Sequence, residues 1–272
     1  MAKPNFVLAV DLDGTLLYRD ELIHPNDVAL LKQGLPCPLI LATGRSLAGV
    51  RRPLQANGLL DSSPVPYPLV LNNGSLSLLP GEKLLHNEPF PLEARRKIIE
   101  VCARHPEAMY VFQGPVVNWQ LGSTPDGEQG AEMYAYNPLL RTPAELVELP
   151  FGKVVCLSLD RGLREAFARD IDGLPVEGNF SLTNIYEITP RGVNKTFGLK
   201  QLLPALGLED LPLAIAGDGD NDLGMFAAAG YSFAPQTGRE MVLQIAGQVI
   251  EVQHRGLLEP ILETMAEAAP QK

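Results

Sequence analysis

The stretch that decides the fold is NFVLAV at residues 5–10, which runs directly into DLDGT at residues 11–15. An unbroken apolar run of this length, rich in β-branched and aromatic residues, is typical of a strand buried on both faces of a parallel sheet. Asp11 and Asp13 stand two residues apart at its end, so their side chains share one face and can enter one crevice. A solvated turn is the alternative, because Asp and Gly are frequent turn residues.

The same pattern of a short apolar segment ended by a polar turn recurs along the chain. The further segments are residues 38–42 before Thr43-Gly44-Arg45-Ser46, residues 68–71 before Asn72-Asn73-Gly74, and residues 213–216 before GDGDND at 217–222. Helical patterns, such as that of residues 26–33, separate these segments. The sequence therefore predicts an α/β fold with a doubly wound, mainly parallel sheet. Its polar turns should converge on one ligand-binding crevice at the carboxyl ends of the strands.

The pattern changes in the middle of the chain. Residues 77–188 combine strands of looser alternation with amphipathic helices, and we expect them to form an inserted α+β domain. The core domain is expected to comprise residues 1–76 and 189–272. Near the end of the core, Thr237 and Glu240 have the spacing of a capping box that opens a helix.

Composition and charge exclude several classes of protein. The 272 residues are 46% hydrophobic and 20% charged, which is typical of a globular chain and not of a disordered one. The formal charge of −10 argues against nucleic-acid partners, and no apolar run is long enough for a membrane helix. Cys37, Cys102 and Cys156 form no CxxC pair, which favours reduced thiols in a cytoplasmic protein. We expect a monomer or a small homo-oligomer.

A second acidic cluster follows the segment at residues 213–216. Asp218, Asp220 and Asp222 would join Asp11 and Asp13 in the crevice, and two carboxylates about 4 Å apart repel by roughly 4 kcal/mol at an effective dielectric constant near 20. Such a cluster calls for a cation, and oxygen ligands that leave room for a substrate phosphate favour Mg²⁺. A calcium-binding loop is the rival interpretation, but its Gly and distal Glu do not follow at the required offsets.

Phosphate also requires hydroxyl and cationic groups. Thr43 ends a strand and could offer a hydroxyl and a backbone N–H, or cap the helix that follows. Lys195 lies at the start of a predicted helix, where the helix dipole disfavours a cation unless it faces negative charge. Arg45 fits a salt bridge as well as it fits a substrate contact.

These segments together resemble the four motifs of the haloacid dehalogenase-like hydrolases, in the same order and spacing. The resemblance extends to the Cof-type branch, which has a large α+β cap of the C2B type. This branch includes sugar-phosphate phosphatases, sucrose-phosphatase-like and mannosyl-3-phosphoglycerate-phosphatase-like enzymes, and phosphomannomutases. The matching residues are Asp11-Leu12-Asp13-Gly14-Thr15, Thr43-Gly44-Arg45, Asn73-Gly74, Ile188 to Lys195, and Gly217-Asp218-x-x-Asn221-Asp222. Residues 232–240 depart from the pattern of many Cof-type members, which leaves the substrate open.

The resemblance implies a role for each matching residue. Asp11 would be the nucleophile and Asp13 the general acid and base. Mg²⁺ would be held by Asp11, the backbone carbonyl of Asp13 and Asp218, with Asp222 as a direct or outer ligand. The residues implied in phosphate binding are Thr43, Gly44, Lys195 and Asn221, and the candidate substrate contacts are Arg45 and Asn73.

The leading hypothesis is a Mg²⁺-dependent phosphatase that acts through an aspartyl-phosphate on a small phosphorylated metabolite, such as a sugar phosphate or a phosphorylated glycoside. A phosphosugar mutase of the same superfamily, a phospho-accepting receiver-like signalling domain and a metal-dependent glycosyltransferase remain as alternatives. In the insert, Arg141, Asn184 and Glu187 are further candidate substrate contacts, and the turn-rich loop at residues 121–130 is a candidate cover for the crevice.

Overall fold

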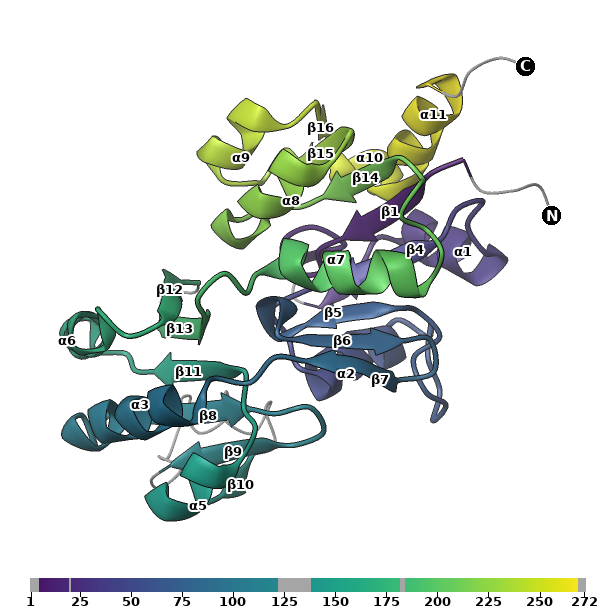
Figure 1. Cartoon of the computed structure of the whole chain (residues 1–272). Coiled ribbons are helices and arrows are strands. Elements are labelled where there is room, and N and C mark those ends of the chain that lie inside the picture. The colour runs from purple at the N-terminus through teal and green to yellow at the C-terminus, as the bar shows by residue number, and fades with distance from the viewer. Residues whose placement is uncertain (1–4, 20, 122–137, 182–183, 269–272) are drawn as a thin grey trace.

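The computed structural model describes residues 5–19, 21–121, 138–181 and 184–268. Figure 1 shows a larger part that contains both ends of the chain and a smaller part formed by its middle. The larger part holds an eight-stranded sheet of order β16-β15-β14-β1-β4-β5-β6-β7. The smaller part holds a six-stranded sheet of order β10-β9-β8-β11-β13-β12. The α/β class with an inserted domain is confirmed.

The strands of the large sheet are β1 (Val7–Val10), β4 (Leu39–Ala42), β5 (Leu69–Leu71), β6 (Leu76–Leu79), β7 (Lys83–Asn87), β14 (Leu213–Ala216), β15 (Tyr231–Pro235) and β16 (Gln248–Ile250). The helices of the core are α1 (Pro25–Gln33), α2 (Leu47–Ala56), α7 (Lys195–Ala205), α8 (Leu223–Ala228), α9 (Glu240–Ile245), α10 (Val252–Arg255) and α11 (Leu258–Ala268). The short elements are the hairpin of β2 (Leu17–Arg19) and β3 (Leu22–Ile23) and the 3₁₀ turns η1 (Asn72–Gly74) and η2 (Asp220–Asp222).

Helices cover both faces of the large sheet, which explains why its central strands are apolar throughout. Every residue of β1, β4 and β5 is buried. Side chains of α1, α2, α10 and α11 pack on one face, and those of α7, α8 and α9 on the other. Strands β16 through β5 in the sheet order run parallel. Their carboxyl ends therefore share one edge, as the doubly wound arrangement requires.

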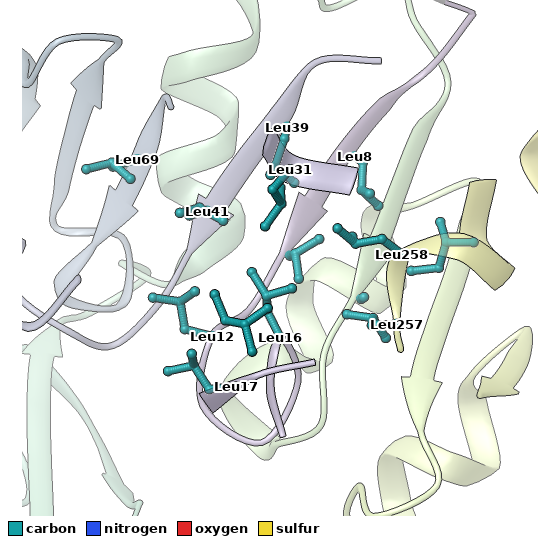
Figure 2. Close-up of a cluster of buried hydrophobic side chains, with 14 of the residues drawn as sticks. Leu8, Leu12, Leu16, Leu17, Leu31, Leu39, Leu41, Leu69, Leu257 and Leu258 are labelled. Atoms are coloured by element: carbon teal, nitrogen blue, oxygen red, sulfur yellow. The ribbon is translucent and has the colours of Figure 1, made fainter. Parts of the chain in front are cut away.

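Leucines dominate the cluster on the first of these faces (Figure 2). Leu8, Leu39, Leu41 and Leu69 project from the sheet, and Leu258 packs against them from α11. Burying one leucine side chain completely contributes roughly 1.5–3 kcal/mol, so this cluster is a major source of stability. It also fixes the register of the strands whose ends build the crevice.

The segment after β5 differs from the expected domain boundary at residue 77. β6 pairs antiparallel with β5, and β7 pairs antiparallel with β6, so both extend the large sheet. Residues 77–87 therefore lie in the core sheet and not in the insert. Their alternation looked looser because a tight antiparallel hairpin replaces the strand–helix crossover of the preceding units.

The insert consists of an antiparallel sheet with helices on one face. Its elements are α3 (Leu92–Arg104), β8 (Met109–Gln113), β9 (Asn118–Leu121), β10 (Leu139–Leu140), α5 (Pro143–Glu148), β11 (Lys153–Leu157), α6 (Arg161–Ile171), β12 (Val176–Phe180) and β13 (Ile185–Pro190). α3, α5 and α6 pack on one face of the sheet. The opposite face carries a small apolar cluster that includes Leu157 and Ile185.

The start of α9 differs from the expectation of a capping box at Thr237. The helix begins at Glu240, its N-cap is Arg239, and no side chain caps it. The backbone N–H of Gly238 donates to Pro235 O at 2.9 Å, so residues 235–238 form a turn that holds Thr237 away from the helix end.

No helix of the described part of the chain combines the length and the apolar character that crossing a bilayer demands. Cys37, Cys102 and Cys156 are buried as free thiols.

Gly74 is required where the core strand β5 turns towards β6. Its φ is +101°, and a Cβ at this position would lie 1.9 Å from the backbone oxygen of Asn194, just before α7. We expect Gly74→Ala to lower the free energy of unfolding by at least about 3 kcal/mol, because strained backbone and overlap with backbone atoms add. Urea denaturation measures this change.

Gly81→Ala is the matched control, because Gly81 also has a positive φ of +77° but a Cβ there meets nothing within 4 Å. Strain alone should cost about 1–2 kcal/mol. Equal losses in the two variants would contradict the close approach at Asn194.

Candidate active site

A cavity of about 520 Å³ lies between the core and the insert. Its core side is formed by loops that follow β1, β4 and β14, and its other side by β11, β12 and β13 of the insert. The crevice is thus at the carboxyl edge of the parallel strands, where the sequence predicted that the polar turns converge.

Lys195 lies between two aspartates, beside Asp11, which lines the crevice. Its Nζ is 2.6 Å from Asp11 Oδ1 and 2.7 Å from Asp222 Oδ1, and the lysine is fully buried. Asp11 follows β1, Asp222 ends η2 after β14, and Lys195 is the first residue of α7. Three distant segments therefore meet in one buried ion cluster, as the sequence predicted for Asp11 and Lys195.

For both Asp11 and Lys195, burial and the opposite charge beside the group shift the pKa in opposite directions. Burial is the largest influence on Asp11 and raises the pKa of its carboxyl well above the ordinary value, against the lowering effect of Lys195. Burial alone would lower the pKa of Lys195, but the neighbouring Asp11 and Asp222 raise it overall. The two aspartates therefore favour the charged form of Lys195.

Both carboxylate oxygens of Asp222 already contact donor groups of the protein. Besides the contact with Lys195, its Oδ2 accepts hydrogen bonds from the backbone N–H groups of Asp218 and Gly219, both at 3.0 Å. These bonds shape the loop after β14 and leave little free coordination on Asp222. This favours the role of an outer residue that orients the loop over that of a direct metal ligand.

The structure offers a site whose donors fit a hard divalent cation. Carboxylate oxygens of Asp11, Asp218 and Asp222 lie within 4.8 Å of one another. Burial and the nearby Asp222 raise the pKa of Asp218 to about 6, and Thr15 Oγ1 donates to its Oδ1 at 3.2 Å. One lysine does not balance three carboxylates, and an all-oxygen donor set is the one that Mg²⁺ prefers.

Gly14 allows the loop after β1 to approach Asp218. Its φ is +74°, and a Cβ there would lie 2.3 Å from Asp218 Oδ2. The loop that carries Asp11 and Asp13 therefore packs closely against the loop that carries Asp218.

Asp13 lines the cavity, but its carboxylate faces a different partner. Arg45 Nε donates to Asp13 Oδ2 at 2.8 Å, and the Asp13 side chain is 55% exposed. Arg45 also donates to Glu21 Oε1 at 2.9 Å. Asp13 is thus not part of the three-carboxylate group, and the salt bridge that the sequence left open for Arg45 is present.

The loop after β4 places its two polar positions differently. Thr43 is fully buried and its Oγ1 accepts a hydrogen bond from the Arg45 N–H at 3.2 Å, which leaves the hydroxyl proton available. Gly44 lines the cavity, and its carbonyl oxygen accepts from Lys153 Nζ at 2.8 Å.

Asn73 links the core to the insert. This residue has a φ of +55°, and its side chain donates to Glu187 Oε1 at 2.6 Å and accepts from Asn221 Nδ2 at 3.3 Å. Glu187 is in turn paired with Lys153, whose Nζ is 2.6 Å from Glu187 Oε2. The candidate contacts Asn73, Asn221 and Glu187 are therefore brought together.

Lys153 and Arg239 are among the residues that line the cavity and that sequence reasoning missed. Lys153 begins the apolar strand β11, and nothing in that pattern marks it as part of a site. Arg239 pairs with Asp220 and donates to Ser181 O at 3.2 Å, which joins α9 to the insert. The single signal for Lys153 is that a charged residue begins a strand that is buried throughout.

The remaining candidates of the insert are less informative. Arg141 Nη1 donates to the Leu140 carbonyl oxygen at 2.7 Å. Asn184 is buried, and its backbone carbonyl accepts from the Ser158 N–H at 3.0 Å. Most of the loop at residues 121–130 lies outside the described residues.

The α/β core, the inserted domain and the carboxylate-lined crevice between them fit a hydrolase with a doubly wound core domain. Residues 8–258 match the haloacid dehalogenase-like hydrolases, and the chain belongs to this family. An uncharacterized hydrolase of Schizosaccharomyces pombe is 30% identical over 99% of this chain and 94% of that protein.

Two further comparisons concern a named phosphatase and a solved structure of the same fold. A 5-amino-6-(5-phospho-D-ribitylamino)uracil phosphatase of Escherichia coli is 26% identical over 97% of both chains. The crystal structure of the Thermotoga maritima protein TM0651 superimposes with a TM-score of 0.75, at 24% identity, over 95% of this chain and 97% of that chain. The resemblance to the family seen in the sequence is therefore confirmed, and the chain is a phosphatase.

Proposed function

We propose that this protein is a Mg²⁺-dependent phosphatase that hydrolyses a small phosphorylated metabolite through an aspartyl-phosphate. The observation that supports it most strongly is the position of Asp11. This residue lines the cavity, and its Oδ1 lies 2.6 Å from Lys195 Nζ. A carboxylate fixed in this way presents one oxygen to a substrate and has a cation beside it to balance developing charge.

The proposed reaction has two steps. In the first, a carboxylate oxygen of Asp11 attacks phosphorus in line with the ester oxygen, the P–O ester bond breaks, and Asp13 gives its proton to the leaving oxygen. In the second, Asp13 takes a proton from water, which attacks the phosphorus and releases phosphate and Asp11. Asp13 lines the cavity, and its contact with Arg45 would have to be exchanged before it acts on the ester oxygen.

Phosphate and metal would share the floor of the crevice. Asp11, Asp218 and the backbone carbonyl of Asp13 would hold Mg²⁺, with Asp222 orienting their loop. The ion supplies positive charge to the phosphoryl oxygens. Thr43, Gly44 and Asn221 would contact the phosphate from the neighbouring loops, and Lys195 would act from beneath.

The substrate is proposed to be a sugar phosphate, a phosphorylated glycoside or a related polyol phosphate. The name of the Escherichia coli relative places its phosphate on a ribityl chain, which is a polyol. A cavity of about 520 Å³ suits a molecule of this size. The three buried free thiols fit a reducing compartment, so we place the protein in the cytoplasm.

A panel of phosphate esters tests this proposal. With Mg²⁺ we expect release of inorganic phosphate from at least one sugar or polyol phosphate. Chelation of the metal with EDTA should abolish this release, and excess Mg²⁺ should restore it. Turnover that persists in EDTA would contradict the metal dependence. An isomerised sugar phosphate formed without free phosphate would instead identify a mutase, and a stable phosphoprotein without turnover would identify a receiver-like domain.

A further inference from the structure

Two charged residues of the insert contact loops of the core. Lys153 and Glu187 are 2% and 7% exposed, and Lys153 Nζ lies 2.6 Å from Glu187 Oε2. The same ammonium donates to the carbonyl oxygen of Gly44 at 2.8 Å, in the loop after β4. A Cβ on Gly44 would lie 3.3 Å from Lys153 Nζ and 2.8 Å from Asn73 Oδ1, so the loop and the insert pack closely at this point.

Stability alone is a weak explanation for this buried ion pair. Removing both charges from water costs about as much as their attraction returns, so such a pair contributes little net stability. The glutamate is also held on its other oxygen, because Asn73 Nδ2 donates to Glu187 Oε1 at 2.6 Å. The specific effect of the pair is therefore to hold the ammonium of Lys153 against the Gly44 carbonyl.

The Gly44 carbonyl belongs to the same peptide unit as the Arg45 N–H. A trans peptide is planar, and its C=O and N–H point in opposite directions. Lys153 contacts the oxygen of this unit from the insert, and the N–H on the other side donates to Thr43 Oγ1 at 3.2 Å. The contact from the insert thus fixes the direction of the donor that the Thr43 hydroxyl accepts from.

Thr43 can offer its hydroxyl to a ligand, because its backbone groups already bind neighbouring segments. Its N–H donates to Val70 O at 2.8 Å, and its carbonyl oxygen accepts from the Asn73 N–H at 3.1 Å. The side chain is fully buried, and a hydroxyl that accepts from one direction keeps its own proton for another. Such a donor stabilises a phosphoryl oxygen most when its direction is fixed in advance.

We propose that Lys153 is a positioning residue of the reaction. Held by Glu187, it orients the peptide between Gly44 and Arg45, and through that peptide the Thr43 hydroxyl that binds the phosphate. The insert thus contributes to the binding of the phosphoryl group itself. This inference rests on the proposed phosphatase activity and assigns a role within it to two residues of the insert.

A variant without both charges of the pair gives the test. Lys153→Met combined with Glu187→Gln keeps the net charge and leaves no lone charge buried, and the new amide oxygen can still accept from Asn73. The readout is the affinity of inorganic phosphate in the presence of Mg²⁺, measured by calorimetry, because phosphate has no leaving group. We expect this affinity to fall at least about fivefold, since a well-oriented hydrogen bond to a charged group contributes about tenfold or more.

The same variant in a Thr43→Val background separates positioning from a structural defect. Because Lys153 acts through the Thr43 hydroxyl, removing the pair should change the phosphate affinity less than about twofold once the hydroxyl is gone. An equal factor in both backgrounds would overturn the inference, since it would show that the pair acts independently of Thr43.

Lys97→Met combined with Glu93→Gln is the matched control. These residues form an exposed pair on α3 of the same insert, with Nζ and Oε1 3.8 Å apart. The control makes the same two substitutions and should leave the phosphate affinity unchanged. Thermal unfolding shows whether each variant is folded. Should the apolar replacement prevent folding, Lys153→Gln with Glu187→Gln keeps polar groups in the buried space, and the same comparison with Thr43→Val applies.

Esters extend the test to turnover. We expect kcat/KM for p-nitrophenyl phosphate and for the sugar or polyol phosphate that the panel identifies to fall by the same factor, because the effect is on the shared phosphate. Factors that differ more than about threefold would overturn the inference and show instead that Lys153 contacts the leaving group.

Failure of the inference and failure of the proposed function are distinguishable. Hydrolysis of no ester by the wild-type enzyme would overturn the proposed function, while the phosphate affinities would still decide the role of Lys153. A wild-type protein that does not bind phosphate would overturn both.

Discussion

Asp11→Asn should lower the rate of phosphate release by at least about 10³-fold, because the amide cannot attack phosphorus to form the proposed aspartyl-phosphate. The substitution keeps the shape of the side chain and removes a charge whose burial already raises the pKa of Asp11. The variant should therefore fold. Steady-state phosphate release and thermal unfolding of the metal-free protein measure the two effects.

Asp210→Asn is the control for the loss of one negative charge, because Asp210 is exposed on the loop before β14. It should keep wild-type turnover. Activity of Asp11→Asn within tenfold of this control would show that Asp11 is not the nucleophile, even if the protein hydrolyses phosphate esters.

Lys195→Met should have the largest effect on stability. It removes the cation that lies 2.6 Å from Asp11 and 2.7 Å from Asp222, in a cluster where the lysine is fully buried. Breaking a buried ion pair by removing one partner typically costs 3–5 kcal/mol, since the remaining charge stays buried. We expect the free energy of unfolding in metal-free buffer to fall by about 3 kcal/mol or more, and turnover to be lost.

Lys200→Met is the matched control, because Lys200 lies on the same helix α7 and is exposed. It should change the free energy of unfolding by less than about 0.5 kcal/mol. A similarly small change in Lys195→Met would show that the ion cluster does not stabilise the core.

The strands of the core could be predicted from the sequence because each is a short apolar run that ends in a polar turn. That pattern located β1, β4, β5 and β14, and with them Asp11 and Asp218. The antiparallel hairpin of β6 and β7 could not be assigned to the core, because local alternation does not reveal which sheet a strand joins.

Contacts between distant side chains are harder to predict. Nothing local indicates that Asp13 would face Arg45, or that Lys153 would reach the carbonyl of Gly44, because these contacts depend on how the insert and the loops pack. Lys195 was an exception. A cation at the start of a helix is unfavourable unless it meets negative charge, and that local conflict pointed to its partners.

Among the described residues, the chain crosses between the two sheets at two places, residues 88–91 before α3 and residues 191–194 before α7. A segment joined in this way can be exchanged without cutting any strand of the parallel core. Gene duplication and recombination could thus replace the recognition module while leaving the catalytic residues untouched, and a protein engineer could graft a foreign module at the same two junctions to redirect the enzyme to a new ester.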